Sequence, residues 1–230
     1  MSETFRLRAV EHDNLGEIVY GQLSEALMKG RFAPDARLTI RDLAGSLGTS
    51  VTPVRDAILR LIQDEALVQR TPRDVRVPIM TLERYWEIRQ IRMKLEGLAA
   101  RESALKASPE DIARLRDLID RNERAIDRKD WLEGLDLNQT FHFALADIAS
   151  MVVLRGILNR LWLQMGPLIA AYYSHGERVM IDQHYNILKA IEDRDPDAAE
   201  LAIISDISNA GDLIKSRLEE ARNSKLTSAT

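Results

Sequence analysis

Apolar residues recur at helical spacing through most of this chain, and a short stretch in its first third is the exception. Residues 15–30 place their apolar side chains on one side of a helix, which Gly30 ends. A second, shorter helix follows, and Thr39 can cap its first turn. Gly48 can stop this helix because glycine accepts the left-handed backbone conformation that a helix end requires.

A third helix begins directly after this stop. Ser50 or Thr52 can cap it, and Pro53 is tolerated in its first turn. Its apolar face is formed by Val54, Ala57, Ile58 and Leu61. Its polar face carries Ser50, Thr52, Arg55 and Arg60. Hydroxyls and a guanidinium at the leading end are typical of a recognition helix in the DNA major groove, although a hairpin of helices with a solvated face has the same pattern.

The non-helical stretch comes next. We expect the third helix to run on to about residue 68, and two extended runs, 67–70 and 75–77, to enclose a turn. Residues 34–38 can add a further short strand. This hairpin carries Arg70, Arg73 and Arg76. A helix-turn-helix followed by a basic hairpin, or wing, indicates DNA binding more specifically than either part alone.

The rest of the chain has no strand pattern and no glycine-rich loop. It predicts six helices, at 81–106, 111–128, 131–149, 152–174, 177–194 and 196–223, with an interruption of the fourth at Gly166-Pro167. The fold class is therefore mainly α, with an N-terminal winged helix-turn-helix and a C-terminal helical bundle. We expect a flexible N-terminus at 1–14, a DNA-binding domain at 15–78, a helical domain at 79–223 and a flexible tail at 224–230.

The winged helix resembles that of the GntR family of bacterial transcription regulators. The resemblance rests on Leu43-Ala44, Leu47-Gly48, Ser50, Thr52-Pro53-Val54-Arg55-Asp56-Ala57 and Glu65-Ala66-Leu67-Val68. It implies DNA contacts from Arg41, Ser50, Val51, Thr52, Arg55 and Arg73. The chain departs from the family pattern at Val51, where many members have arginine, and at Asp35 and Asp74, where glycine is usual.

The second half is similar to the FCD domain of the FadR subfamily. The matching stretches are Arg92-Met93-Lys94-Leu95-Glu96, Asn138-Gln139-Thr140-Phe141-His142 and the run from His184 to Asp195. Many FCD domains bind a divalent metal with one aspartate and three histidines. The resemblance places Asn138, His142, His184 and Asp206 at those positions, so that Asn and Asp replace the usual Asp and His.

Two uses of this polar group follow from the resemblance. It can hold a divalent metal such as zinc, nickel or manganese, or it can be a hydrogen-bonded pocket whose histidines contact Asp206 or an organic ligand directly. Related domains often bind small carboxylates, and Arg92 is the cation we expect to meet one. The alternative for Arg92 is a surface ion pair with Glu96, four residues later.

Charge and composition support a regulator. Formal charge is −4 for the whole chain, yet residues 29–78 contain nine Lys and Arg against six Asp and Glu. A locally basic module on an acidic body fits a DNA reader with a separate regulatory part. The chain has no cysteine, no signal-peptide pattern at its start and no apolar run of the roughly 20 residues that span a membrane, so we expect a cytoplasmic protein.

The sequence thus predicts a transcription regulator, a repressor or an activator, that binds a palindromic double-stranded DNA operator as a homodimer. A small organic acid in the helical domain is expected to modulate it. The alternative is a helical metal-dependent enzyme in which His142, His184 and Asp206 act on a small acid. We see no nucleophile, phosphate loop or paired general acid and base, and therefore expect no catalysis.

Overall fold

The structure is a computed structural model that describes residues 15–176, 178 and 181–227, so the predicted flexible segment 1–14 lies outside it. Its helices are α1 (Leu15–Met28), α2 (Ile40–Leu47), α3 (Val51–Gln63), α4 (Leu82–Lys106), α5 (Pro109–Asp127), α6 (Trp131–Ile148), α7 (Val152–Gly176), α8 (Asp182–Glu192) and α9 (Pro196–Thr227). Its strands are β1 (Arg37–Leu38), β2 (Val68–Thr71) and β3 (Asp74–Arg76). The predicted fold class is confirmed.

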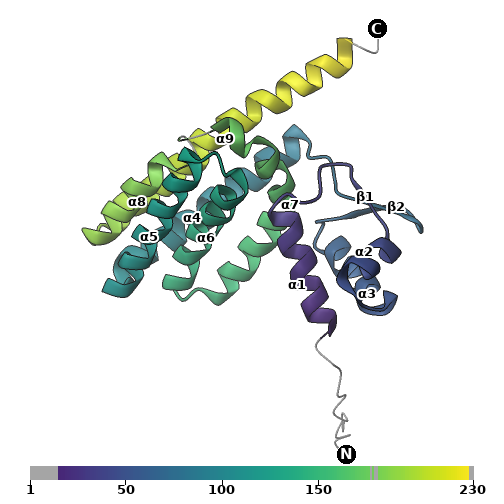
Figure 1. Cartoon of the computed structure of the whole chain (residues 1–230). Coiled ribbons are helices and arrows are strands. Elements are labelled where there is room, and N and C mark those ends of the chain that lie inside the picture. Colours follow the sequence, from purple (N-terminus) through teal and green to yellow (C-terminus); the bar gives the residue numbers. More distant parts are fainter. Residues whose placement is uncertain (1–14, 177, 179–180, 228–230) are drawn as a thin grey trace, which may run out of the picture.

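The N-terminal part is a winged helix, with α1 to α3 on one side and a three-stranded antiparallel sheet of order β1-β3-β2 on the other (Figure 1). The predicted hairpin is present, but α3 ends at Gln63 rather than near residue 68. Glu65 takes a left-handed conformation with φ of 58° and turns the chain. Ala66 and Leu67 are then buried in a bend that leads into β2, with both backbone N–H groups donating to the Leu61 carbonyl, and this bend replaces the predicted end of the helix.

The C-terminal part is a bundle of α4 to α9. Thr81, Ser108 and Asp130 cap three of its helices through their side chains. The predicted interruption at Gly166-Pro167, where a kink is expected, does not end the helix, because α7 continues through it with Pro167 inside. One missing backbone hydrogen bond is tolerated where both flanks of a helix are held by packing.

The final helix is longer than expected. It continues to Thr227, four residues past its predicted end at residue 223, and its end projects beyond the bundle (Figure 1). Residues 218–226 contain no glycine or proline that would stop a helix. Within the described residues, no helix is both long and apolar enough to cross a membrane.

The two parts are joined by tight packing of α1 on α7, and α1 lies between α3 and the bundle (Figure 1). Leu163 of α7 is fully buried in the core of the winged helix. At Gly166 an added Cβ would lie 2.5 Å from the Met28 Cα, so glycine allows the two helices to approach closely. Arg160 pairs with Asp64 at 3.0 Å across the same joint. The winged helix is therefore fixed to the bundle.

Candidate functional site

The helix-turn-helix presents the predicted DNA-contacting side chains on its outer face. The Thr39 side chain accepts a hydrogen bond from the Asp42 backbone and caps α2, and Gly48 ends it with φ of 63°. Ser50 precedes α3 without making a side-chain cap, so its hydroxyl remains available to a partner. The exposed residues at this end are Arg41, Ser50, Val51, Thr52 and Arg55. Val54, Ala57, Ile58 and Leu61 face the core as predicted.

The arginines of this face differ in whether they already have partners. Among the described residues, neither Arg41 nor Arg55 lies in an ion pair. Arg60 was predicted on the same polar face, but it pairs with Glu17 at 2.6 Å and its guanidinium lies 4.0 Å from the Tyr20 ring centroid. Arg60 therefore supports the packing of α1 on α3, whereas Arg41 and Arg55 are free to meet phosphate or base edges.

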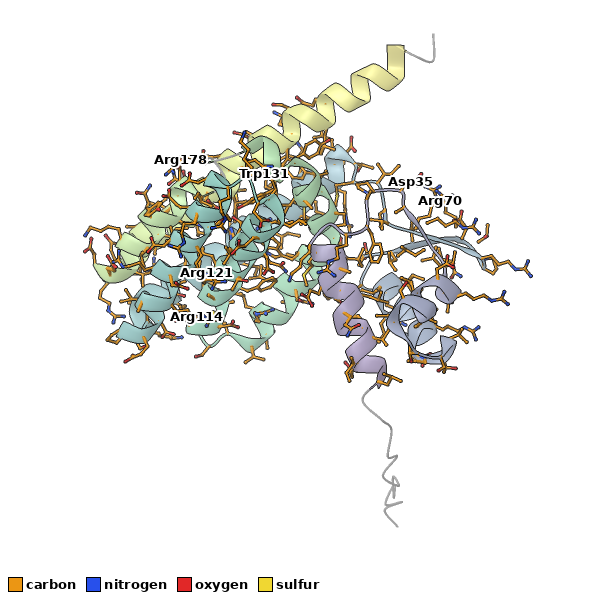
Figure 2. The ribbon with its side chains drawn as sticks, in the orientation of Figure 1. Asp35, Arg70, Arg114, Arg121, Trp131 and Arg178 are labelled. Carbon is orange, nitrogen blue, oxygen red and sulfur yellow. The ribbon has the colours of Figure 1, made fainter. Side chains whose placement is uncertain are left out.

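The wing is braced by Asp35. Its backbone has φ of 64°, which explains why glycine is usual here and why aspartate, a residue that tolerates this region, can replace it. Its carboxylate pairs with Arg70 at 2.7 Å and Arg76 at 3.3 Å, and Figure 2 shows Asp35 and Arg70 at the wing. Arg73 at the tip is exposed, and its carbonyl accepts from Arg37. In the part of the chain that the structure describes, Arg73 is the wing arginine that has no ion pair, whereas Arg70 and Arg76 both pair with Asp35.

Inside the bundle, a polar cluster is built around Glu96, whose side chain is only 1% exposed. Arg92 donates to its carboxylate at 2.6 Å, His142 Nδ1 lies 2.6 Å from it, and Trp162 Nε1 donates at 3.3 Å. Burial alone would raise the pKa of Glu96, but the Arg92 guanidinium and His142 outweigh it and hold that pKa at about 2. Glu96 is therefore a buried carboxylate anion. The ion pair of Arg92 with Glu96 is present as considered, but it lies inside the bundle and not on the surface.

Three potential metal ligands lie next to this ion pair. His142 Nε2 is 3.4 Å from Asp206 Oδ2, and His184 Nε2 is 3.7 Å from Asp206 Oδ1. All three side chains are buried, and their potential ligand atoms lie within 4.8 Å of one another. Both ring nitrogens of His184 and Oδ1 of Asp206 are without a hydrogen-bond partner. Asn138, which is 4% exposed, lines a cavity with His142 and Asp206.

These residues fit a divalent cation. In a tetrahedral site with bonds of 2.0–2.1 Å, ligand atoms lie roughly 3.3 Å apart. Each histidine here lies 3.4 to 3.7 Å from a different oxygen of Asp206, so a single ion would draw the three side chains slightly closer together. Glu96 orients His142 through Nδ1, as carboxylates do for metal-bound histidines. Burial, followed by the effect of His142, lowers the pKa of His184 well below its usual value, which keeps that ring neutral. Burial raises the pKa of Asp206 to about 7.

The cavity beside this cluster has a volume of about 30 Å³, the space of about one water molecule. Its polar wall contains Arg89, Arg92, Asn138, His142 and Asp206. Its apolar wall is made by Trp162, Met165, Ile169, Ile207 and Ile214, with Tyr85 and Ala210 beside them. An organic acid needs more room than this, so the cavity in this conformation does not hold one.

The sequence predictions did not include two residues that line this cavity, Arg89 and Trp162, and they considered Glu96 only as a surface partner of Arg92. The RxxLE motif contained Glu96, but its burial depends on residues of α6 and α7 that lie 46 and 66 positions away. Arg89 lies one turn before Arg92, and this spacing places both arginines on the same face of one helix, which is the sequence signal that could have identified Arg89. Trp162 carried no signal beyond a generic core position.

Comparison with known proteins agrees with both halves of this description. Bacterial regulatory proteins of the gntR family match residues 15–76, and the FCD domain matches residues 87–209. The HTH-type transcriptional regulator McbR of Escherichia coli K12 is 30% identical over 190 residues, covering 81% of this chain and 86% of McbR. The chain belongs to the GntR family. It is a DNA-binding transcription regulator with an FCD effector-binding domain, in the FadR-like group.

Two further similarities support the assignment. The solved structure of E. coli McbR/YncC superimposes with a TM-score of 0.84 at 27% identity, covering 90% of this chain and 99% of that one. The HTH-type transcriptional regulator YdhC of Bacillus subtilis is 26% identical over 207 residues, with 88% of this chain and 92% of YdhC covered. All three comparisons span both domains, so this GntR-family chain shares their whole architecture.

Proposed function

We propose that this regulator binds a palindromic operator as a homodimer, with α3 of each copy in the major groove. Arg41, Ser50, Val51, Thr52 and Arg55 would contact the groove, and Arg73 of the wing the neighbouring backbone. The observation that carries this proposal is the exposed position of all six together with the unpaired guanidiniums of Arg41 and Arg55. Two-fold pairing on a palindrome doubles the few contacts that one winged helix offers.

The effector of this regulator, we infer, is a small carboxylate bound at the bundle cavity, next to Arg92, Asn138, His142, His184 and Asp206. Buried polar atoms without partners are costly and mark places where a ligand or ion is expected. A divalent metal held by His142, His184, Asp206 and the Asn138 amide oxygen would supply positive charge for the carboxylate. Replacement of two usual ligands by Asn and Asp should make this metal site weaker than the full set.

Ligand binding can reach the DNA-binding part through α7. Trp162 touches the polar cluster through Glu96, and the next residue, Leu163, is buried in the winged-helix core. Gln164 donates to the Asp64 carbonyl at 3.1 Å just after α3. A ligand that favours one position of α7 would therefore bias the two winged helices, provided it binds the two states with different affinity.

Selection of binding sites from random DNA, followed by sedimentation of the complex, tests the operator proposal. We expect a palindromic consensus bound by two chains, with affinity that falls steeply as salt rises. Monomeric protein at micromolar concentration with and without DNA, or selection of no consensus, would contradict the proposal.

A thermal-shift screen of small organic acids, with and without zinc, nickel or manganese, tests the effector proposal. An effector should raise the melting temperature and change operator affinity in the same concentration range. The enzyme alternative predicts turnover of the acid instead. The transcription regulators among the relatives favour a regulator, and turnover by the full chain would overturn this choice.

A further inference from the structure

The cavity contains a second buried arginine whose charge is not neutralised as that of Arg92 is. Arg89 is 4% exposed and lies one turn before Arg92 on α4. Arg92 has the buried carboxylate of Glu96 at 2.6 Å. The acidic partner of Arg89 is Asp212 at 3.0 Å, and the Asp212 side chain is 70% exposed. Water screens such a carboxylate, so it compensates a buried guanidinium only in part.

The hydrogen bonds of Arg89 are also incomplete. One terminal nitrogen donates to the Ser208 carbonyl at 2.7 Å and to Asp212, whereas its buried Nε has no partner. The guanidinium lies 4.8 Å from the Trp86 ring centroid, which holds its plane. Nε and a terminal nitrogen form an edge with two parallel donors, the arrangement that binds a carboxylate at both oxygens.

The wall that covers Arg89 is a single turn of α9. Tyr85 donates to the Gly211 carbonyl at 2.7 Å, and Arg89 holds Ser208 and Asp212 of the same turn. A Cβ at Gly211 would lie 2.5 Å from Arg89 Nε, so the backbone of α9 lies directly on the guanidinium. Release of these few bonds would let α9 move outward and enlarge the small cavity.

We propose that Arg89 binds the carboxylate of the effector and that Asp212 is an intramolecular counter-ion which the ligand displaces. The apolar wall of Met165, Ile169, Ile207 and Ile214 then selects an acid with a short apolar body. Displacement of Asp212 also frees the α9 turn, which couples binding to movement of the bundle wall. This inference deepens the proposed effector function and rests on it.

Calorimetry on the full chain with propionate and hexanoate tests the assignment, with 1-propanol and 1-hexanol as uncharged matches and sodium chloride as the ionic-strength control.

Asp212→Asn removes the competing carboxylate and should tighten acid binding about three- to tenfold. Arg89→Gln should weaken it about 10- to 100-fold, since charge-assisted hydrogen bonds are lost. Lys215→Gln, one turn after Asp212 and also near Trp86, should leave it unchanged.

Three results would overturn the inference: acids that bind no better than the alcohols, Asp212→Asn with unchanged or weaker acid affinity, or loss of binding in Arg92→Gln but not in Arg89→Gln. The Asp212→Asn measurement stays decisive if Arg89→Gln does not fold, because it predicts a gain. Operator affinity of each variant is measured alongside. If acid binding and the operator response do not depend on Arg89, the role assigned to Arg89 is wrong, whereas the proposed effector-responsive regulator still stands.

Discussion

Asp206 is the residue whose ionisation is least supported by its surroundings. Glu96, of the same charge, has Arg92, His142 and Trp162 as donors, whereas Asp206 has an oxygen without any partner. Burial therefore raises the pKa of Asp206 to about 7. The folded protein holds a proton there that the unfolded chain releases near pH 4, so this group's contribution to stability is lost as pH rises from about 4 to 7.

Substitution of Asp206 by asparagine should remove that pH dependence. At pH 8 we expect Asp206→Asn to be more stable than the wild type by on the order of 4 kcal/mol, corresponding to a shift of about three pH units. The difference should shrink toward zero near pH 4. Urea denaturation of both proteins between pH 4 and 8, in the presence of a chelator, measures it. Parallel stability curves would show that Asp206 is ionised in the fold throughout this range.

Metal binding provides a second prediction at this scale. Because a metal needs the ionised Asp206, its affinity should fall about tenfold per pH unit as the pH falls below 7. The double substitution Asn138→Asp with Asp206→His should tighten binding, because it restores a charged oxygen and a third imidazole. Calorimetry with zinc, manganese and nickel tests both statements, and a double variant that binds no better argues against a metal site.

Among the elements, the recognition helix shows what local sequence can and cannot reveal. The caps at Thr39 and Ser108 and the stop at Gly48 were predictable because each depends on residues within one turn. The role of Arg60 was not predictable from local sequence, because its partners Glu17 and Tyr20 lie about 40 positions earlier. The burial of Arg92 with Glu96 and the continuity of α7 through Pro167 likewise depend on packing between distant helices.

The leading end of α3 carries a prediction about operator sequence. Val51 is 42% exposed there, at the position where the sequence departs from the arginine of the GntR pattern, and its side chain ends in methyl groups. It can contact a thymine methyl but cannot donate to guanine. We expect Val51→Arg to add a guanine preference at one position of each half-site, worth roughly 1–3 kcal/mol against other bases. Site selection with wild type and variant reveals this, and identical consensus sequences would place Val51 away from the bases.

For the whole molecule, the close contact of α1 with α7 makes the winged helix and bundle one mechanical unit. Gly166→Ala would place a Cβ 2.5 Å from Met28 Cα and should destabilise the protein by roughly 1–3 kcal/mol. Gly156→Ala is the matched control on the same helix, since nothing lies within 4 Å of its added Cβ, and it should be neutral or slightly stabilising. Thermal melts compare the two, and equal effects would mean that the joint is loose.

The same pair of variants connects stability with regulation. If α7 transmits the effector signal, Gly166→Ala should reduce the change in operator affinity that an effector causes, whereas Gly156→Ala should preserve it. An unaltered response in Gly166→Ala, with operator binding intact, would require a route other than the α1 and α7 contact.

The central claim is that the unpaired arginines of the helix-turn-helix read the operator, and titration of a labelled operator with Arg41→Ala, Arg55→Ala and Arg60→Ala tests it most directly. Arg55→Ala should cost roughly 1–3 kcal/mol of binding, and Arg41→Ala should also weaken it and reduce its salt dependence. Arg60→Ala, whose side chain is already held by Glu17 and Tyr20, should bind with nearly wild-type affinity. Unchanged affinity in both Arg41→Ala and Arg55→Ala would contradict the account.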